Sequence, residues 1–132
     1  LYYRAKAHLE DNQFGLAVVD LTPLAKEVRT AMGAEAKYQL ANCYFQLGSI
    51  DMAEEEIMSF TKMQTSQQYW LAKSLILLSD INVARNDLFQ AKQYLLALQS
   101  SYRQEDDIQS IITQKLSAIA ELDSNTTEEN TL

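Results

Sequence analysis

The stretch AEAKYQLANCYFQLGSIDMAEEEI, residues 34–57, decides the fold. Its small and apolar side chains recur at helical spacing on both sides of Gly48, which lies where two helices would meet in a turn. Two other segments, NQFGLA at residues 12–17 and NDLFQA at residues 86–91, match its centre, GSIDMA at residues 48–53. The spacings between these segments are 36 and 38 residues, which is typical of helical repeat proteins.

Each segment has the residues that a tight turn between two helices needs. Asn or Gly opens it, because these residues tolerate the left-handed backbone that ends a helix. An apolar residue follows two positions later, where it can fill the space under the turn: Phe14, Ile50 and Leu88. A small residue five positions later lets two helices approach closely: Ala17, Ala53 and Ala91. Matching residues extend the register: Ala5, Ala41 and Ser79; Leu21, Ile57 and Leu95; Leu24, Phe60 and Leu98.

The pattern predicts an all-α chain of about seven antiparallel helices in a single domain, residues 1–122. With 3 glycines and 1 proline in 132 residues, the chain also has few of the turn residues that a β-rich fold uses. Six helices are expected at about residues 1–11, 14–31, 34–47, 50–64, 67–85 and 88–102. A seventh, with one apolar stripe, is expected at about residues 107–122, where it would cap the array.

Three local features refine this prediction. Pro23 should kink or break the second helix near Thr22, because proline removes a backbone donor and clashes with the preceding turn. Gly33 marks the junction between the first two units. Residues 123–132 have no helical periodicity and are predicted to form a disordered acidic tail.

The charge distribution argues against a nucleic-acid surface. The formal net charge is −7, and four of the 18 acidic residues lie after residue 120, where there is no basic residue. Lys and Arg are scattered singly, whereas a nucleic-acid surface clusters them. No apolar run approaches the roughly 18 residues that a membrane span needs. The single cysteine cannot form an internal disulfide.

Residues 1–102 resemble the tetratricopeptide repeat (TPR) family. The second unit has the signature residues at the family's spacings: Leu40, Ala41, Tyr44, Gly48, Ala53 and Ile57. The third unit departs from the signature at Asn82, where tyrosine is usual, and the first at Arg4 and His8, where leucine and tyrosine are usual. The resemblance implies a right-handed superhelix of helix pairs, with repeats at about residues 1–31, 34–64 and 67–102.

The resemblance also implies a non-catalytic protein-binding module with a concave groove lined by the first helix of each pair. The expected groove residues are Tyr2, Tyr3, Lys6, Tyr38, Gln39, Asn42, Phe45, Gln46, Lys73, Ile76, Leu77 and Asp80. One subgroup of the family holds the terminal carboxylate of chaperones with Lys, Asn and Arg. Asn42 and Lys73 fit that clamp, but Tyr2, Gln39 and Leu77 do not. We therefore expect another peptide, a helix or a protein surface as the partner.

Several residues whose side chains could react or bind a ligand also have a purely structural interpretation. Cys43 would be a nucleophile only if a base such as His8 lowered its pKa, and its position in the repeat favours packing instead. Residues 54–56 are consecutive glutamates, which point about 100° apart on a helix and so do not converge on one metal ion. Trp70, beside Tyr69, either packs on the preceding helix or anchors a partner. We expect no catalytic, cofactor or metal site.

A structural role is the alternative function. The chain would then be the C-terminal cap of a longer solenoid, whose upstream helices would pack on Tyr2 and Tyr3 within a multiprotein assembly. An enzyme is the least favoured class. By analogy with the family, a bacterial periplasmic or envelope-associated location is favoured over a cytoplasmic one, and the residues themselves leave the compartment open.

Overall fold

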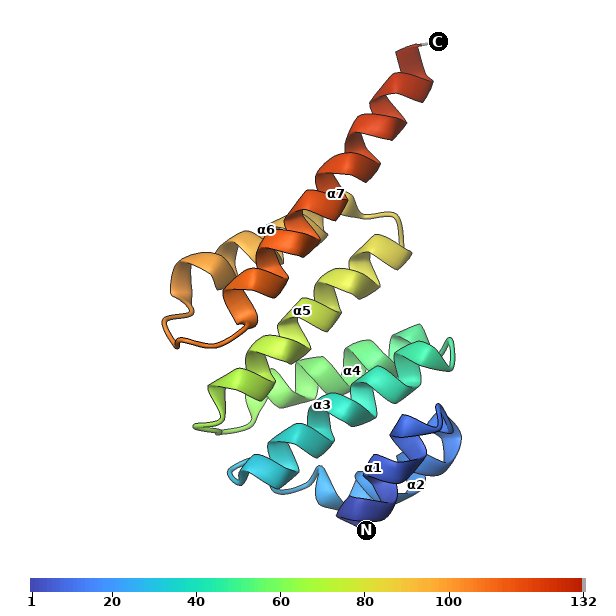
Figure 1. Ribbon diagram of the computed structural model, residues 1–132, viewed down its shortest axis with the longest axis vertical. Helices are drawn as coiled ribbons and strands as arrows, with labels where there is room; N and C mark the ends of the chain where they lie inside the picture. Colours follow the sequence, from blue (N-terminus) through green and yellow to red (C-terminus); the bar gives the residue numbers. More distant parts are fainter. Residues whose placement is uncertain (132) are drawn as a thin grey trace. The chain divides into compact units, whose positions relative to one another are not determined.

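The computed structural model describes residues 1–131, with the side chains of residues 1–125. This part of the chain consists of seven α-helices and has no strand, so the predicted all-α class is confirmed (Figure 1). The helices are α1 (Tyr2–Glu10), α2 (Phe14–Leu24), α3 (Ala31–Gln46), α4 (Ile50–Lys62), α5 (Gln68–Ala84), α6 (Leu88–Ser101) and α7 (Ile108–Thr131).

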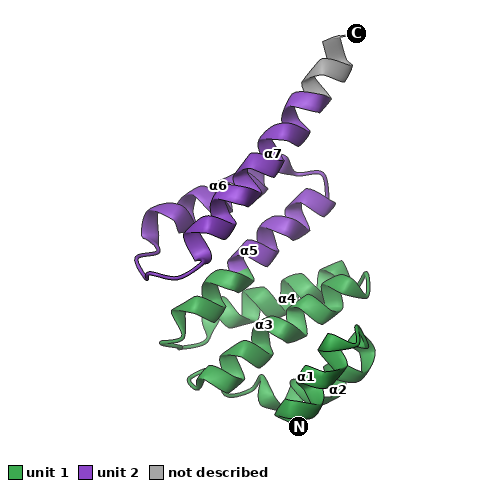
Figure 2. Ribbon diagram, viewed as in Figure 1, with its two compact units in different colours: residues 1–74 green, residues 75–132 purple. Residues whose placement is uncertain are grey.

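The chain divides into two compact units, residues 1–74 and residues 75–132 (Figure 2). In the first unit, α1 packs on α2, α2 on α3, and α3 on α4. In the second unit, α6 packs on α7. The boundary falls inside α5, at a position that the repeat pattern does not mark.

The three repeat-opening residues all adopt the predicted left-handed backbone. The φ angles are 57° at Asn12, 82° at Gly48 and 62° at Asn86. In each turn, the amide of the next residue donates a 2.8 Å hydrogen bond to a carbonyl five positions earlier: Gln13 to His8, Ser49 to Tyr44 and Asp87 to Asn82. This bond satisfies a carbonyl at the end of the first helix, so the same turn is built three times.

The residues of the repeat register form the core, as predicted. Ala17, Ala53 and Ala91 are each 0% exposed, because each lies where neighbouring helices approach closely. Four register positions are half-buried: Leu24, and Phe14, Ile50 and Leu88 under the turns. The other matching positions are buried: Ala5, Ala41, Ser79, Leu21, Ile57, Leu95, Phe60 and Leu98. The sequence register therefore identified the packed face of these helices correctly.

The second helix is shorter than predicted. The expected helix over residues 14–31 ends at Leu24, one residue after Pro23. Proline cannot donate to the preceding turn, so the helix loses a hydrogen bond close to its end. The Thr22 hydroxyl donates to the Val18 carbonyl at 2.7 Å, and the Ala25 amide makes the last bond, to Leu21, at 2.9 Å.

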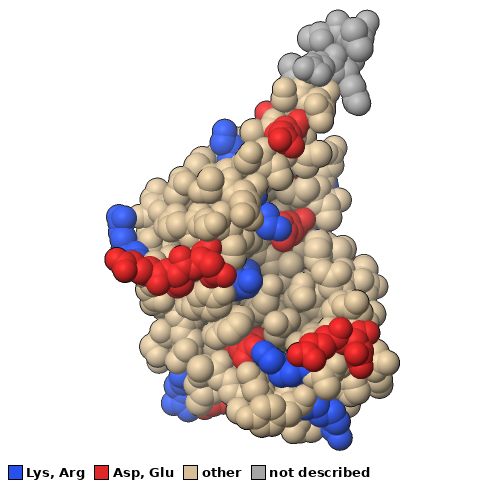
Figure 3. All heavy atoms as spheres, in the orientation of Figure 1, with Lys and Arg blue, Asp and Glu red and all other residues tan. Residues whose placement is uncertain are grey.

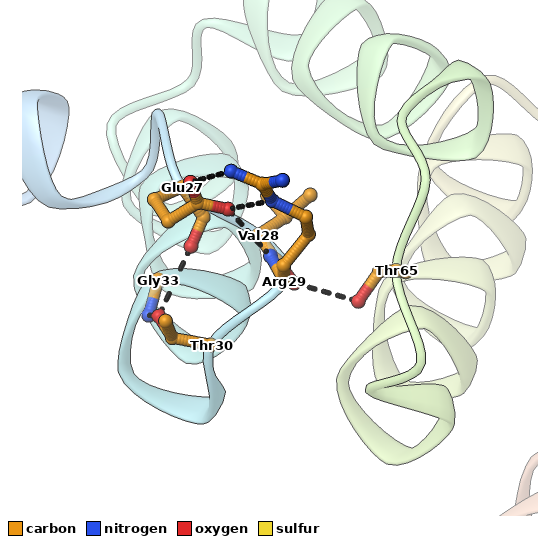
Figure 4. Close-up of polar contacts among 6 residues, drawn as sticks. All are labelled: Glu27, Val28, Arg29, Thr30, Gly33 and Thr65. Carbon is orange, nitrogen blue, oxygen red and sulfur yellow. Dashed lines mark hydrogen bonds and ion pairs between the residues drawn. The ribbon is translucent and has the colours of Figure 1, made fainter.

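The chain between α2 and α3 is tied down by polar contacts (Figure 4). The Thr65 hydroxyl donates to the Val28 carbonyl at 2.6 Å, and the Val28 side chain is buried beside Phe60. The Thr30 hydroxyl accepts a 3.0 Å hydrogen bond from the amide of Gly33, which caps α3. The segment between α2 and α3 therefore has a defined structure, and it is hydrogen-bonded to the segment after α4.

Gly33 was predicted to mark the junction between the first two repeats. It lies instead inside the first turn of α3. A Cβ atom at this position would be 1.7 Å from the carbonyl oxygen of Glu27. Glycine is needed here because the preceding loop passes directly over the helix.

The last helix is longer than predicted. We expected it to end near residue 122, with a disordered tail over residues 123–132, but α7 continues to Thr131. Position 132 lies outside the described residues. Residues 123–131 contain neither proline nor glycine, so nothing in this stretch breaks a helix that has already begun. At the other end, the Asp106 carboxylate accepts a 2.9 Å hydrogen bond from the Ile108 amide at the start of the helix.

Candidate functional site

One face of α3 carries most of the predicted groove residues of the second repeat. Asn42 lies four residues after Tyr38 and three after Gln39, so its side chain shares a face of the helix with both, and each of the three is half-buried. The buried side chains of α3 that form the core, among them Leu40 and Cys43, point elsewhere. The core therefore does not occupy this face of α3.

A hollow of about 390 Å³ lies beside this face in the first unit. Its lining residues are Lys6, Leu9, Glu10, Asn12, Phe14, Gln39 and Asn42. The lining combines three amides that can both donate and accept hydrogen bonds, two apolar side chains and two opposite charges. Lys6 was predicted as a groove residue of the first repeat, and Gln39 and Asn42 as groove residues of the second; the structure brings them together.

Glu35 joins α1 to α3 at the edge of this surface. Its side chain accepts a 2.7 Å hydrogen bond from the Tyr2 hydroxyl and another of 2.7 Å from the Lys6 ammonium. These hydrogen bonds raise the pKa of both Tyr2 and Lys6, so Tyr2 stays protonated and Lys6 stays charged. Glu35 is 9% exposed. Tyr2 and Lys6 thus help to hold the two helices together.

An aromatic row lies on the same side of α3. The rings of Tyr38 and Trp70 are 5.8 Å apart and inclined by 30°, and Tyr69 meets Trp70 edge-on at 4.9 Å. The Lys73 ammonium lies 5.4 Å from the centre of the Tyr38 ring, within range of a cation–π interaction. Trp70 also packs against the cluster around Phe60, which supports the packing interpretation, while part of its surface remains accessible.

Three predicted groove residues belong to the second unit: Ile76, Leu77 and Asp80. Ile76 and Leu77 are buried, at 5% and 4% exposure, and so are not available to a partner in this structure. Asp80 forms a 3.0 Å ion pair with Lys115 of α7. Burial raises the pKa of Asp80, while Lys115 opposes this change. The ion pair places α7 beside this face of α5, so the terminal helix is one cover for it.

The remaining predicted residues lie at the margins. The Tyr3 side chain is 85% exposed, and its ring meets that of Tyr2 edge-on at 5.3 Å. Phe45 is half-buried and Gln46 is exposed. The Gln46 amide donates a long hydrogen bond of 3.5 Å to the Asn42 side chain. These residues extend the α3 face without closing it.

Cys43 has the properties of a packing residue, as expected. It is 0% exposed, and burial raises its pKa to about 11, so almost no nucleophilic thiolate forms at neutral pH. The imidazole of His8, the candidate base, lies 3.9 Å from the Asp20 carboxylate. Among the side chains that the structure describes, no three of the His, Cys, Asp and Glu residues are placed to hold a metal ion together.

Two ion pairs that each have one buried partner were missed by the sequence analysis. Lys37 of α3 pairs with Glu56 of α4 at 2.7 Å, and the Lys37 side chain is 10% exposed. Arg4 of α1 makes 2.6 and 2.8 Å hydrogen bonds to Asp20 of α2, whose side chain is 3% exposed. A signal was present for Lys37, which lies one helical turn before Leu40 on the core side of α3. A lysine on the core side of a helix needs an oppositely charged partner nearby.

Three further findings concern the basic side chains on the surface, membrane-spanning helices and similarity to known proteins. On the face drawn in Figure 3, Lys and Arg side chains do not form a continuous stripe. Within the described residues, no helix is both long enough and apolar enough to cross a membrane. No family model matches the chain, and no curated protein or solved structure is significantly similar to it.

Proposed function

We propose that the chain is a non-catalytic protein-interaction module of the TPR type, and that the α1 and α3 faces in the first unit bind a peptide or protein segment. One observation carries the proposal. Lys6, Gln39 and Asn42, which the resemblance to the TPR family assigns to one groove, line a single hollow. Three identical left-handed turns at spacings of 36 and 38 residues support the repeat assignment.

The chemistry of this surface fits a peptide backbone with a few anchoring side chains. The amides of Gln39 and Asn42 can pair with backbone groups, because an amide offers both donors and an acceptor. Leu9 and Phe14 provide an apolar floor for an aliphatic side chain. The ring of Tyr38, which contacts both Trp70 and Lys73, supplies an aromatic contact of the kind that often dominates binding energy.

The test is peptide selection followed by charge substitution in the hollow. Peptides from a displayed random library would be selected on the immobilised full chain, and their affinities measured by fluorescence anisotropy. Gln39→Lys places a second ammonium beside Lys6, which should weaken binding by about tenfold or more. Gln93→Lys, the same change at an exposed site on α6, should leave the affinity unchanged.

Two results would contradict the proposal. One is a failure to select any peptide that competes with itself in solution. The other is equal affinity for the original protein and the Gln39→Lys variant, with helical content unchanged by circular dichroism. The second result would mean that peptides bind elsewhere on the chain.

A mainly structural role is the second candidate. It is supported by α7, whose Ile108, Ile112 and Ile119 are buried and whose Lys115 pairs with Asp80. These contacts give α7 the character of a helix that closes a repeat array. A protein that served only as a scaffold would keep its assembly in the cell when Gln39 is replaced by Lys.

A further inference from the structure

The indole N–H of Trp70 is a hydrogen-bond donor that the chain itself does not use. The Trp70 side chain is half-buried, and it packs against the cluster around Phe60. Within the described residues this N–H donates no hydrogen bond, and every buried side-chain nitrogen or oxygen has a partner. The indole nitrogen is therefore in contact with solvent. A packed tryptophan with an open donor can hold a ligand by a ring contact and a hydrogen bond together.

The aromatic row of Tyr38, Trp70 and Tyr69 surrounds this donor with rings. The ring centres of Tyr38 and Trp70 are 5.8 Å apart, and Tyr69 meets Trp70 edge-on at 4.9 Å. Tyr38 and Tyr69 are half-buried, as Trp70 is. The contacts among the rings restrict their motion before a ligand arrives, so a ligand that packs on them loses little affinity to the ordering of side chains.

Amide side chains continue this surface along α3. Asn42 lies four residues after Tyr38, and Gln46 lies four residues after Asn42, to which its amide donates at 3.5 Å. Gln39 and Asn42 line the hollow of the first unit. Each amide is uncharged and can donate to a carbonyl oxygen. Ring faces and neutral donors therefore follow one another along the same helix.

Other common modes of peptide recognition fit this surface less well. Addition of a strand needs an exposed sheet edge, and residues 1–131 form no strand. An amphipathic helix needs an apolar groove, whereas five of the seven side chains that line the hollow are polar. A phosphorylated motif or a terminal carboxylate needs several available cations, but Lys6 is paired with Glu35 and Lys73 lies against Tyr38. Recognition of proline by aromatic side chains is the mode that matches.

We propose that this surface binds a proline-rich segment in the polyproline II conformation, with proline rings on Tyr38 and Trp70. Such a segment has no internal hydrogen bonds, so its carbonyls are free to accept from the Trp70 indole and from the Gln39 and Asn42 amides. Its proline rings are rigid, so packing them costs almost no side-chain entropy. This assignment rests on the proposed function, because it narrows the partner class of the same surface.

The first test compares two displayed peptide libraries on the immobilised full chain. One library has proline at every third position and the other has alanine there, and both are random elsewhere and lack tryptophan. Peptides from the proline library should bind at least about tenfold more tightly, because the alanine peptides must lose more backbone freedom on binding. Replacing the prolines of a selected peptide by alanine should remove this advantage.

The second test uses the emission of Trp70, which is the only tryptophan of the chain. A proline ring on the indole displaces water, so a selected peptide should shift the emission to shorter wavelength. Titration of this shift should give the same dissociation constant as fluorescence anisotropy of the labelled peptide. The measurement uses the original chain, so it does not depend on whether a variant folds.

Three variants assign the contacts. Trp70→Phe keeps a ring and removes the donor, which should weaken binding about fivefold. Tyr38→Ala should weaken it at least about tenfold, because a central aromatic contact is lost. Phe89→Ala is the control, since this aromatic side chain is 73% exposed on α6 and should not affect binding. Circular dichroism would show whether each variant keeps its helices.

The outcomes separate this inference from the proposed function. Trp70 emission that stays unchanged at saturation would overturn the inference, and so would equal affinities for proline and alanine peptides. An affinity that neither Trp70→Phe nor Tyr38→Ala alters would do the same. In each of these cases peptides still bind, so the proposed function stands. If neither these libraries nor the random library yields a binding peptide, both are wrong.

Discussion

Gly33 shows how one missing side chain can fix the path of a loop. The Glu27 carbonyl oxygen would lie 1.7 Å from a Cβ at this position, and the Leu24 carbonyl oxygen 3.1 Å from it. Gly33→Ala should therefore lower the free energy of unfolding by about 2–3 kcal/mol, since backbone atoms must move to relieve the overlap. Urea denaturation would measure the loss.

The control for Gly33 is Met32→Ala, which changes the neighbouring side chain in the same turn. Met32 is 45% exposed, so its removal should cost no more than about 0.5 kcal/mol. Equal stability of the Gly33→Ala variant and the original chain would show that the loop does not pass over α3 as described.

Asp20 should make the stability depend on pH. The hydrogen bonds from Arg4 lower the pKa of this carboxyl below its ordinary value of about 4. Its contribution is therefore complete above that ordinary pKa and is lost as the pH falls through the lower value in the folded state. We expect Asp20→Asn to reduce the urea midpoint at neutral pH and to shrink the further decrease on acidification to pH about 3.

Glu27→Gln is the comparison for Asp20. Its pair with Arg29 lowers the pKa of Glu27 to about 2, yet the Glu27 side chain is 48% exposed. Solvent screens such a pair, so this variant should change the neutral-pH midpoint little. If Asp20→Asn and the original chain lost stability in parallel on acidification, the Arg4–Asp20 pair would not be the source of the pH dependence.

At the scale of the elements, we predict graded losses of stability for substitutions in the turn after the first helix of each pair. Gly48 has φ of 82°, and the equivalent positions carry Asn12 and Asn86. Gly48→Ala should cost about 1–2 kcal/mol, because a Cβ is disfavoured in the left-handed region. Gly48→Asn should cost less, because asparagine already makes the same turn twice in this chain.

Thermal unfolding of the two Gly48 variants gives this order directly. A Gly48→Ala variant at least as stable as Gly48→Asn would contradict it. Asn12→Gly serves as the reciprocal control, since glycine at an equivalent turn should be tolerated.

For the whole molecule, the sequence was sufficient to predict the features that depend on a residue's own backbone preference or on helical spacing. Asn12, Gly48 and Asn86 end helices because of their own backbone preferences, and the burial of Ala17 and Ala53 follows from helical spacing. The end of α2 depended on how far a helix continues past a proline, which local preference does not fix.

Features that depend on two distant segments could not be predicted. Whether Ile76 and Leu77 line a groove or are buried depends on what covers α5, and no property of those two residues decides it. The Lys37 and Glu56 pair likewise requires the packing of α3 on α4. Of the candidate site, the shared face of α3 could be predicted because it follows from spacing within one helix.

Cys43 can report how often the α1–α3 core opens, because it is the only cysteine and is 0% exposed. Its pKa of about 11 and its burial should make modification by Ellman's reagent in the native state far slower than in urea. Leu40, in the same cluster, is 3% exposed, so Leu40→Ala should cost about 3 kcal/mol and speed labelling roughly 100-fold. Leu47→Ala removes a leucine that is 51% exposed and should leave the rate unchanged. Rapid labelling of the original chain, insensitive to Leu40→Ala, would mean that Cys43 is reached without opening this core.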